Sequence, residues 1–219
     1  MRYDFNGYTF SFLHPANTNK LEEFLSFLLL EYDYRKRYWS VEQGDTVIDV
    51  GVDFGSYSLT ALAMGANVVA IEPRLESVNN LKRNASMNPG FLKRLRVIQT
   101  ALDNKHAATC FDESNGRSST NRTGCTESVR TQRLDDLDLT TVDWIKIDTE
   151  GSELRILQGA QQVIRVNKPI MIVEAHLSYD KSMDKKVMSL LKQLNPEYRF
   201  RVTTDLLGMI ARYRHVFAY

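Results

Sequence analysis

The stretch VIDVGVDFGSYSL, from Val47 to Leu59, decides the fold. A short apolar run rich in β-branched residues ends at Asp49, and Gly51 and Gly55 then lead into a helical segment. Glycine lets the backbone approach a ligand and the following helix offers unpaired N–H groups, so this pattern is typical of a nucleotide-binding turn. The Gly-x-x-x-Gly spacing falls short of the GxGxxG of dinucleotide folds, and Asp53 stands where a pyrophosphate would need positive potential.

Short apolar strands alternate with helical segments outward from this stretch. Strands are expected at Thr46–Val50, Asn67–Ile71, Leu95–Thr100, Val142–Ile147 and Ile170–Val173, and helices at about Tyr57–Met64, Glu76–Met87 and Ser152–Ile164. This alternation predicts an α/β fold, with a mostly parallel sheet and helices on both of its faces. A further helix at Lys181–Leu194 precedes strands at Tyr198–Thr203 and His215–Tyr219. The last pair is expected to close one edge of the sheet, with an antiparallel C-terminal strand.

The first 40 residues differ from this pattern. Aromatic and polar residues alternate around Asn6 and Gly7, which predicts a type I′ hairpin, and the apolar spacing from Leu21 to Leu29 predicts a helix. We therefore expect a hairpin and helix extension over residues 1–40 and one main domain over residues 41–219.

A polar excursion interrupts the main domain between Asp103 and Arg133. Its centre, SNGRSSTNRTG, is rich in Ser, Asn and Gly and has little periodicity, which is typical of a surface loop. The flanking segments Ala107–Phe111 and Ser128–Arg133 are candidates for the two strands of a hairpin.

Composition limits the classes of function. The 219 residues hold 28 Lys and Arg against 27 Asp and Glu, a formal net charge of +1, so no positive field favours broad nucleic-acid binding. The two cysteines, Cys110 and Cys125, form no CxxC pair, which argues against a zinc site or a disulfide framework. No cleavable apolar leader is visible, and the longest apolar run, Phe24–Leu30, is too short to cross a bilayer. We expect a cytoplasmic protein without a membrane span.

An acidic residue ends the second predicted strand. Glu72 follows the apolar run VVAI and precedes Pro73. An acid at this place accepts both hydroxyls of a ribose in dinucleotide-binding folds. A ribose-containing ligand is therefore expected, with a solvent-facing turn acid as the alternative.

Charged residues also gather where the fourth and fifth predicted strands end. Lys146, Asp148 and Glu150 alternate along the end of the fourth strand, and Glu174 and His176 follow the apolar run of the fifth. Carboxyl ends of parallel strands share one edge of the sheet, where ligands bind in open α/β folds. Histidine is suited to take a proton near neutral pH. The set can therefore orient and deprotonate a hydroxyl, bind a metal or form a salt-bridge cluster.

The same residues raise the question of a metal. Carboxylate oxygens with a single imidazole suit Mg²⁺ or Mn²⁺. The candidate ligands are Asp148, Glu150, Glu174 and His176, and the sequence leaves open whether a metal binds.

Taken in order, VIDVGVDFGSY, VVAIEP, WIKIDTEGSELRILQGA and IMIVEAH resemble the FkbM-type S-adenosylmethionine-dependent methyltransferases. The resemblance covers about Thr46 to His176, and Ile145 to Ala160 is its most specific part. It implies a Rossmann-like class I methyltransferase fold with S-adenosylmethionine as the methyl donor. The first loop departs from the family's Gly-Ala-Asn-x-Gly, because Asp53 replaces the amide.

The resemblance also implies donor-binding residues. They are Asp49, Gly51, Asp53 and Gly55 around the methionine part, Glu72 at the ribose, Asp103 toward the adenine, and Tyr57 either over the donor or packed on its helix. The donor carries a sulfonium and an ammonium and no pyrophosphate. An acid-bearing glycine loop therefore suits it better than NAD.

Members of this family mostly methylate hydroxyls of sugars or small natural products. The resemblance thus implies O-methylation of a hydroxyl on a sugar or glycan, a deoxyhexose for example, or on a related small molecule. Methyl transfer is an in-line displacement, so the enzyme aligns the acceptor oxygen and removes its proton. We expect His176 or Asp148 to be the base, with Lys146, Glu150 and Glu174 orienting the acceptor or each other. Aromatic residues of the extension either hold a sugar or anchor the extension: Tyr32, Tyr34, Tyr38 and Trp39.

Two other classes of function stay open. An NAD-dependent oxidoreductase is disfavoured by Asp53 and by the missing GxGxxG. A nucleic-acid or protein methyltransferase is disfavoured by the balanced charge and by Asp148-Thr149-Glu150, which stands where amino-group methyltransferases have Asn/Asp-Pro-Pro-Tyr. The oligomeric state is not predicted.

Overall fold

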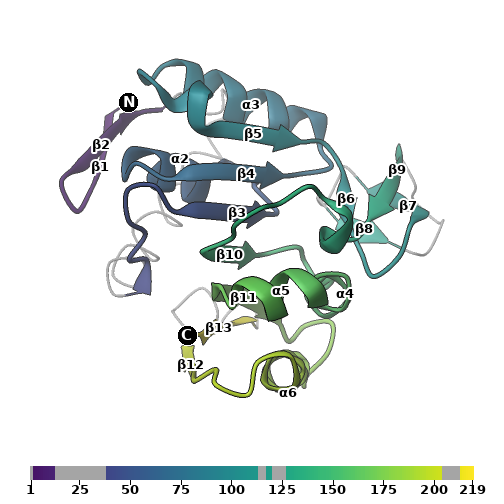
Figure 1. The fold of residues 1–219 in the computed structure, drawn as a ribbon. Coiled ribbons are helices and arrows are strands. Elements are labelled where there is room, and N and C mark those ends of the chain that lie inside the picture. The colour runs from purple at the N-terminus through teal and green to yellow at the C-terminus, as the bar shows by residue number, and fades with distance from the viewer. Residues whose placement is uncertain (1, 13–37, 113–116, 120–126, 204–212) are drawn as a thin grey trace.

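A computed structural model describes residues 2–12, 38–112, 117–119, 127–203 and 213–219. Its centre is a seven-stranded sheet in the order β12-β13-β11-β10-β3-β4-β5 (Figure 1). The strands are β3 (Thr46–Val50), β4 (Asn67–Ile71), β5 (Leu95–Ile98), β10 (Trp144–Ile147), β11 (Ile170–His176), β12 (Phe200–Thr203) and β13 (Tyr213–Ala218).

The sheet is mostly parallel, as predicted. β11, β10, β3, β4 and β5 pair in parallel, whereas β13 runs antiparallel to both β11 and β12. The C-terminal pair does cover one edge, but β13 is inserted between β11 and β12, so that β12 is the edge strand. The expected antiparallel C-terminal strand and the Rossmann-like fold class are confirmed.

Helices cover both faces of the sheet because side chains of each strand point alternately to two cores. Val47, Val68 and Trp144 join one core with α2 (Ser56–Ala63) and α3 (Leu75–Ser86). Ile48 and Ile145 join the other. The second core includes three helices, α4 (Glu153–Gln158), α5 (Gln161–Asn167) and α6 (Met183–Leu194).

The single helix predicted over Ser152–Ile164 is wrong, because the chain forms α4 and α5 with a break at Gly159. A Cβ on Gly159 would lie 2.3 Å from the carbonyl oxygen of Asp103, so only glycine allows this approach. Its own carbonyl accepts the N–H of Asp135 at 2.9 Å. The carboxylate of Asp135, in the 3-10 helix η2 (Leu134–Asp136), then caps α5 by accepting the N–H groups of Gln162 and Val163.

The fifth predicted strand is longer than expected. β11 continues to His176 because β13 pairs with its last residues, Glu174 opposite His215 and His176 opposite Tyr213. Glu174 and His176 therefore stand on a rigid strand rather than in a loop. The third strand is shorter than expected, since β5 ends at Ile98.

The N-terminal hairpin forms as predicted. β1 (Arg2–Phe5) and β2 (Tyr8–Ser11) are joined by Asn6 and Gly7, which have φ of 52° and 83°, as a type I′ turn requires. Phe5 and Phe10 enter the core shared with α2. The helix predicted at Leu21–Leu29 lies outside the described residues, and the division into 1–40 and 41–219 stays a prediction.

Two aromatic residues at the end of the extension pack on the core. The ring of Trp39 lies 5.0 Å from that of Tyr57 and 5.2 Å from that of Trp144, and Tyr38 lies 4.4 Å from Phe217. This matches the anchoring alternative for these two. Tyr32 and Tyr34 lie outside the described residues.

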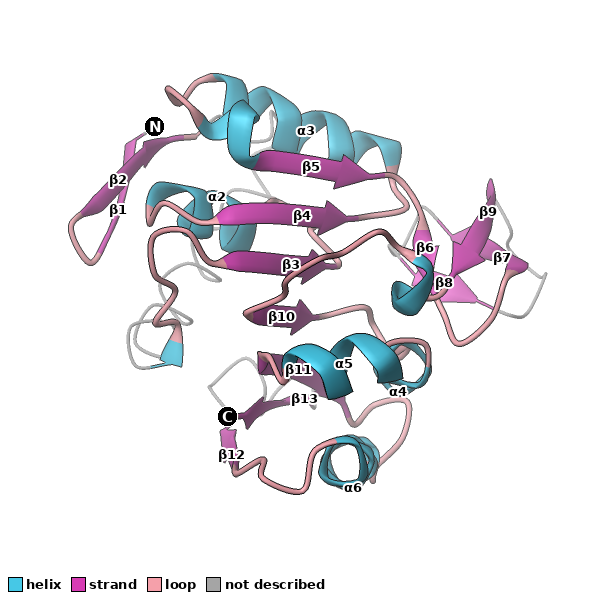
Figure 2. Ribbon diagram, in the orientation of Figure 1, coloured by secondary structure: helices cyan, strands magenta, loops and turns pink. Residues whose placement is uncertain are grey.

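The polar excursion forms a second, small sheet in the order β6-β9-β7-β8. Its strands are β6 (Ala101–Leu102), β7 (Ala107–Asp112), β8 (Arg117–Ser119) and β9 (Glu127–Gln132). β7 and β9 pair antiparallel, as predicted for the two flanking segments, but they are not a simple hairpin, because β8 lies between them in sequence and pairs with the other edge of β7. Figure 2 places this sheet beside the carboxyl ends of β3, β4, β5 and β10, toward which the arrows point.

Another 3-10 helix, η1 (Phe91–Arg94), precedes β5. Among the described residues, every helix is too short or too polar to span a membrane.

Candidate active site

The glycine loop, residues 51–55, connects the carboxyl end of β3 to α2 and has three residues in the left-handed region. Gly51, Asp53 and Gly55 have φ of 79°, 48° and 82°. A Cβ on Gly51 would lie 1.7 Å from the carbonyl oxygen of Asp148, so this position admits only glycine. Asp53 takes a conformation that Asp and Asn adopt more readily than most residues. The loop thus brings backbone against the end of β10.

Glu72 lies at the tip of β4, directly beside the glycine loop. One carboxylate oxygen accepts the N–H of Val52 at 3.0 Å and that of Asp53 at 3.5 Å, and the other accepts the N–H of Arg74 at 2.9 Å. Burial raises the pKa of Glu72, although these backbone bonds and the charge of Arg74 oppose the shift. Glu72 therefore holds the loop, and its contact with a ribose stays a prediction.

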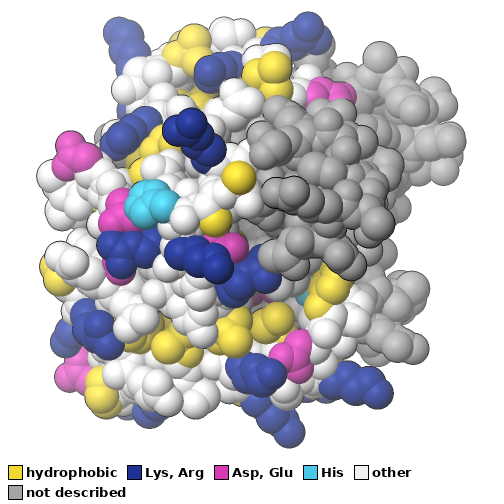
Figure 3. Space-filling view, turned by 90° about the vertical axis from the view of Figure 1, so that its right-hand side faces the viewer, with side chains coloured by type: hydrophobic (Ala, Val, Ile, Leu, Met, Phe, Trp, Pro, Cys, Tyr) yellow, Lys and Arg dark blue, Asp and Glu magenta, His cyan; other side chains and the backbone are white. Residues whose placement is uncertain are grey.

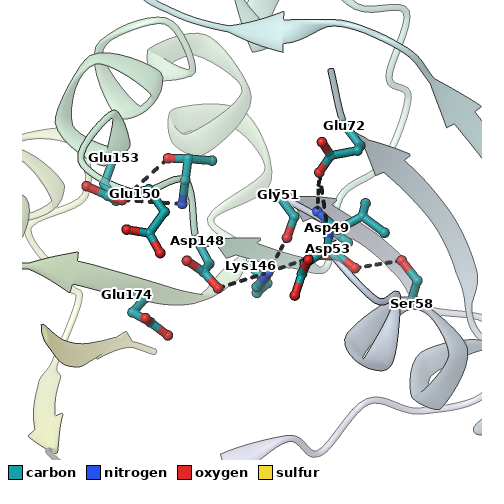
Figure 4. Close-up of polar contacts among 12 residues, drawn as sticks. Asp49, Gly51, Asp53, Ser58, Glu72, Lys146, Asp148, Glu150, Glu153 and Glu174 are labelled. Atoms are coloured by element: carbon teal, nitrogen blue, oxygen red, sulfur yellow. Dashed lines mark hydrogen bonds and ion pairs between the residues drawn. The ribbon is translucent and has the colours of Figure 1, made fainter. Parts of the chain in front are cut away.

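Beneath the loop, Asp49 and Lys146 form a buried pair (Figure 4). Asp49 is fully buried; one oxygen accepts the hydroxyl of Ser58 at 2.6 Å and the other lies 3.4 Å from Nζ of Lys146. The ammonium also donates to the carbonyl of Gly51 and lies 3.7 Å from Oδ2 of Asp148. Lys146 thus connects the glycine loop to Asp148 at the end of β10.

Two of the residues that the resemblance implies for donor binding, Tyr57 and Asp103, are buried in the protein. Tyr57 is 3% exposed, and Nζ of Lys146 lies 5.1 Å above its ring, which matches the alternative of packing on the helix. Asp103 lies at the end of β6, where Oδ1 accepts the N–H of Asn104 at 2.7 Å and Oδ2 lies 3.2 Å from Nε of Arg155. The approach of Asp103 to an adenine stays a prediction.

On the far side of Lys146 lies a second group, the carboxylate–histidine cluster, formed by Asp148, Glu150, Glu174 and His176. Around Nε2 of His176 lie Oε1 of Glu174 at 3.3 Å, Oε2 of Glu150 at 3.6 Å and Oδ1 of Asp148 at 3.9 Å. Figure 4 shows the three carboxylates facing a common space. The structure thus brings together these four of the sequence-predicted residues.

Glu153 belongs to this region but was not predicted. It is fully buried at the start of α4, and its Oε1 accepts the N–H of Gly151 at 2.9 Å and contacts Nδ1 of His176 at 3.0 Å. Glu153 stands two residues after Glu150-Gly151 in the motif WIKIDTEGSELRILQGA, and this position could have indicated that it belongs to the site. His215 was missed too; its Nε2 lies 3.1 Å from Oε2 of Glu174, and only the pairing of β13 with β11 brings the two together.

The cluster shifts the pKa values of its members strongly. Burial disfavours charge on His176, but the neighbouring carboxylates of Glu153 and Glu174 outweigh it and raise the pKa of His176 to about 12. For Glu174 burial is likewise outweighed, by the two histidines, and its pKa falls to about 2. Burial and the negative charge of Glu174 raise the pKa of Asp148 to about 8. Of these three groups, Asp148 is the carboxyl whose pKa its surroundings raise toward neutral.

The surface around the site carries both signs of charge. Seen from the side toward which β3, β4 and β10 point, Lys and Arg side chains lie close to Asp and Glu side chains (Figure 3). Arg133 contacts Asp136, which also lies 2.7 Å from Nε2 of His106. The described residues of the molecule thus include paired opposite charges outside the cluster.

The parallel sheet, with the glycine loop after β3 and acids where the next strands end, has the Rossmann-like fold of the class I methyltransferases. More specifically, the chain belongs to the FkbM family of S-adenosylmethionine-dependent methyltransferases, because the family's profile, described as the methyltransferase FkbM domain, matches residues 49–202. No curated protein sequence matches the chain.

Solved structures share the fold. The methyltransferase FkbM from Methylobacillus flagellatus has a TM-score of 0.64 at 17% identity, over 93% of this chain and 56% of that one. The chain thus spans just over half the length of that protein. A proposed methyltransferase from Streptococcus mutans, solved with S-adenosylhomocysteine, has a TM-score of 0.52 at 10% identity, over 94% and 98% of the two chains. An rRNA methylase from Streptococcus thermophilus has a TM-score of 0.52 at 9% identity, over 86% of this chain and 95% of that one.

Proposed function

We propose that this chain transfers a methyl group from S-adenosylmethionine to a hydroxyl of a sugar or glycan. The observation that carries the proposal is the arrangement at the carboxyl edge of the sheet. There the glycine loop and the carboxylate–histidine cluster lie on either side of Lys146, which contacts both Gly51 and Asp148. A donor site and a site for removing a proton are thus neighbours.

The donor side suits a cationic ligand. S-adenosylmethionine presents a sulfonium and an ammonium, and the loop offers Asp53 and, at the tip of β4, Glu72. Membership in the FkbM family and the bound S-adenosylhomocysteine of the Streptococcus mutans protein support the choice of donor. The loop's acid and its Gly-x-x-x-Gly spacing disfavour NAD, whose pyrophosphate needs a positive environment.

The acceptor side suits a hydroxyl. In the reaction, an electron pair of the acceptor oxygen attacks the methyl carbon in line with the sulfur, and the carbon–sulfur bond breaks. S-adenosylhomocysteine leaves, and the hydroxyl proton passes to the protein. When no cation is bound, geometry favours Asp148 over His176 as the group that takes this proton. The side chain of Asp148 is 23% exposed beside Gly51, whereas that of His176 is 5% exposed between Glu153 and Glu174.

Screening of acceptors tests the proposal. The protein and methyl-labelled S-adenosylmethionine are incubated with a panel of monosaccharides and glycosides, with total RNA, and with a protein extract. We expect label in O-methyl sugars, identified by mass spectrometry, and none in the macromolecules. Label confined to RNA or protein would overturn the choice of acceptor, and absence of donor binding would overturn the activity itself.

A further inference from the structure

We propose that Asp148, Glu174 and His176 bind one divalent cation of the Mn²⁺ and Mg²⁺ type. The ligand atoms are Oδ1 of Asp148, Oε1 of Glu174 and Nε2 of His176, and atoms of these three residues lie within 4.8 Å of one another. They come from the ends of two adjacent parallel strands, β10 and β11. Binding of the cation stands by itself, whereas its use on an acceptor rests on the proposed function.

The distances around Nε2 of His176 are those of ligands rather than of hydrogen bonds. A charged N–H···O bond is about 2.7–2.9 Å long, and the three carboxylate oxygens lie at 3.3, 3.6 and 3.9 Å. Neighbouring ligands of an octahedral ion with bonds of about 2.1 Å are separated by about 3.0 Å, and opposite ones by about 4.2 Å. The observed separations fall within this range, so a small contraction brings the atoms to one ion.

The ring of His176 is held as a metal ligand is usually held. A ligating histidine almost always donates its other ring N–H to a carboxylate, which fixes the ring and leaves the remaining nitrogen for the metal. Here Nδ1 lies 3.0 Å from Oε1 of the fully buried Glu153, and Nε2 points into the cluster. By contrast, His106 makes an ordinary ion pair, with its Nε2 2.7 Å from a single carboxylate, that of Asp136.

The carboxylate of Glu174 is oriented in the same manner. Its Oε2 lies 3.1 Å from Nε2 of His215 on β13, which leaves Oε1 facing His176. Ligating carboxylates are commonly held by such outer hydrogen bonds. Two proposed ligands therefore have outer partners on different elements, α4 and β13, and neither partner is itself a ligand.

The balance of charge also favours a cation. Asp148, Glu150, Glu153 and Glu174 bring four carboxylates to this region, and the nearby Lys146 divides its single charge between Asp49 at 3.4 Å and Asp148 at 3.7 Å. A divalent ion at the centre replaces protons as the compensating charge, because ligands must be deprotonated to bind.

The ligand types indicate the class of ion. Two carboxylates and one imidazole, with no sulfur among them, suit Mn²⁺ and to a lesser degree Mg²⁺. The side chain of Glu150 is 43% exposed and that of Asp148 is 23% exposed, so one side of the site faces solvent. The remaining coordination positions can take water or the acceptor hydroxyl. A bound cation lowers the pKa of that hydroxyl, and Asp148 then serves as a ligand while the proton leaves to Glu150 or water.

Titration of the chelator-treated full chain with MnCl₂, followed by the electron paramagnetic resonance of free Mn²⁺, tests the proposal. We expect saturable one-to-one binding that Asp148→Asn and Glu174→Gln each weaken about 100-fold, and that Glu153→Gln weakens about 10-fold. Asp136→Asn, which alters the carboxylate–histidine pair outside the cluster, is the matched control and leaves the affinity unchanged. Circular dichroism reports whether each variant is folded.

The outcomes separate this proposal from the proposed function. Lack of saturable Mn²⁺ binding by the wild-type chain overturns the cation site, even if no variant folds. Equal weakening by Asp148→Asn and Asp136→Asn overturns it as well, since it indicates unspecific surface binding. Binding of S-adenosylmethionine is measured on the same samples, so that failure of the donor site is seen independently of the cation.

Discussion

The glycine loop and the carboxylate–histidine cluster, which we propose as the donor side and the acceptor side of the site, surround their buried carboxylates in opposite ways. On the donor side each acid has its own partners, backbone N–H groups for Glu72 and Ser58 with Lys146 for Asp49. On the acceptor side three carboxylates converge on one imidazole at distances of 3.3 to 3.9 Å. In the first arrangement each acid is held by its own neighbours, whereas the second leaves room for a proton or a cation. This contrast is the basis on which we propose rigid support of a donor for one half of the sheet edge and reactivity toward an acceptor for the other.

Replacement of Gly51 by alanine tests the junction of the two sides and has the largest expected effect. The new Cβ would overlap the carbonyl of Asp148, and φ of 79° adds strain. We expect loss of donor binding and a large drop in melting temperature. Gly44→Ala is the matched control, because Gly44 has φ of 95° but open space around it. This substitution is expected to lower the free energy of unfolding by about 1–2 kcal/mol. Thermal unfolding measures the melting temperature of each variant, and calorimetric titration measures its affinity for S-adenosylmethionine. Equal effects of the two changes would contradict the close contact.

Asp148→Asn tests the acceptor side alone. The amide keeps the shape of the side chain but neither takes a proton nor balances a cation. We expect kcat to fall about 100- to 1,000-fold on an acceptor that the wild type methylates, with the affinity for S-adenosylmethionine unchanged. Asp143→Asn, just before the amino end of β10, is the control, because the carboxylate of Asp143 accepts the N–H of Thr46 at the opposite end of this strand. Wild-type turnover by Asp148→Asn would remove Asp148 from the reaction.

Lys146→Met tests the connection between the sides. Removal of the ammonium leaves the charge of the fully buried Asp49 facing only the neutral hydroxyl of Ser58 among the contacts described above, and breaking a buried pair in this way costs about 3–5 kcal/mol. We expect lower stability in urea and weaker donor binding together. Lys186→Met removes a largely exposed pair with Asp180 and is expected to leave the stability nearly unchanged, because solvent screens the two charges. A stability of Lys146→Met close to that of the control would show the pair to be unimportant.

Glu72→Gln has the smallest expected effect on folding and opposite effects on stability and binding. Burial raises the pKa of Glu72 above its ordinary value of 4.5. Its stabilising contribution is therefore full below about pH 4.5 and is lost as pH rises through the raised pKa. At pH 8 the neutral amide should make the protein slightly more stable than wild type, and this gain should vanish near pH 4. Loss of the charged acceptor should weaken donor binding about 10-fold. Lower stability of the variant at pH 8 would contradict the raised pKa.

Local patterns were sufficient to predict most of the fold. Continuous apolar strands such as VVAI and the Asn6-Gly7 turn are encoded by neighbouring residues, so the sheet and hairpin follow from them. The break at Gly159 was not predictable, because it depends on Asp103 and Asp135, which are far away in sequence. The extension of β11 to His176 likewise depends on β13.

The site residues also divide into those that local sequence patterns predict and those that depend on contacts between distant segments. Glu72, Asp148 and His176 were recognised because they follow strands, and parallel strands bring their ends together. Glu153 was missed because its contact with His176 arises from the turn through Glu150 and Gly151, whose φ values of 54° and 102° no residue pattern specified. His215 was missed because a histidine in a buried strand usually indicates packing.

Calorimetric titration of the protein with S-adenosylmethionine, S-adenosylhomocysteine and NAD tests the central claim most directly, that the glycine loop is a methyl-donor site. We predict saturable binding of the first two and none of NAD, retained by Asp148→Asn and lost in Gly51→Ala. Binding of NAD alone, or binding of S-adenosylmethionine that Gly51→Ala leaves unchanged, would contradict it.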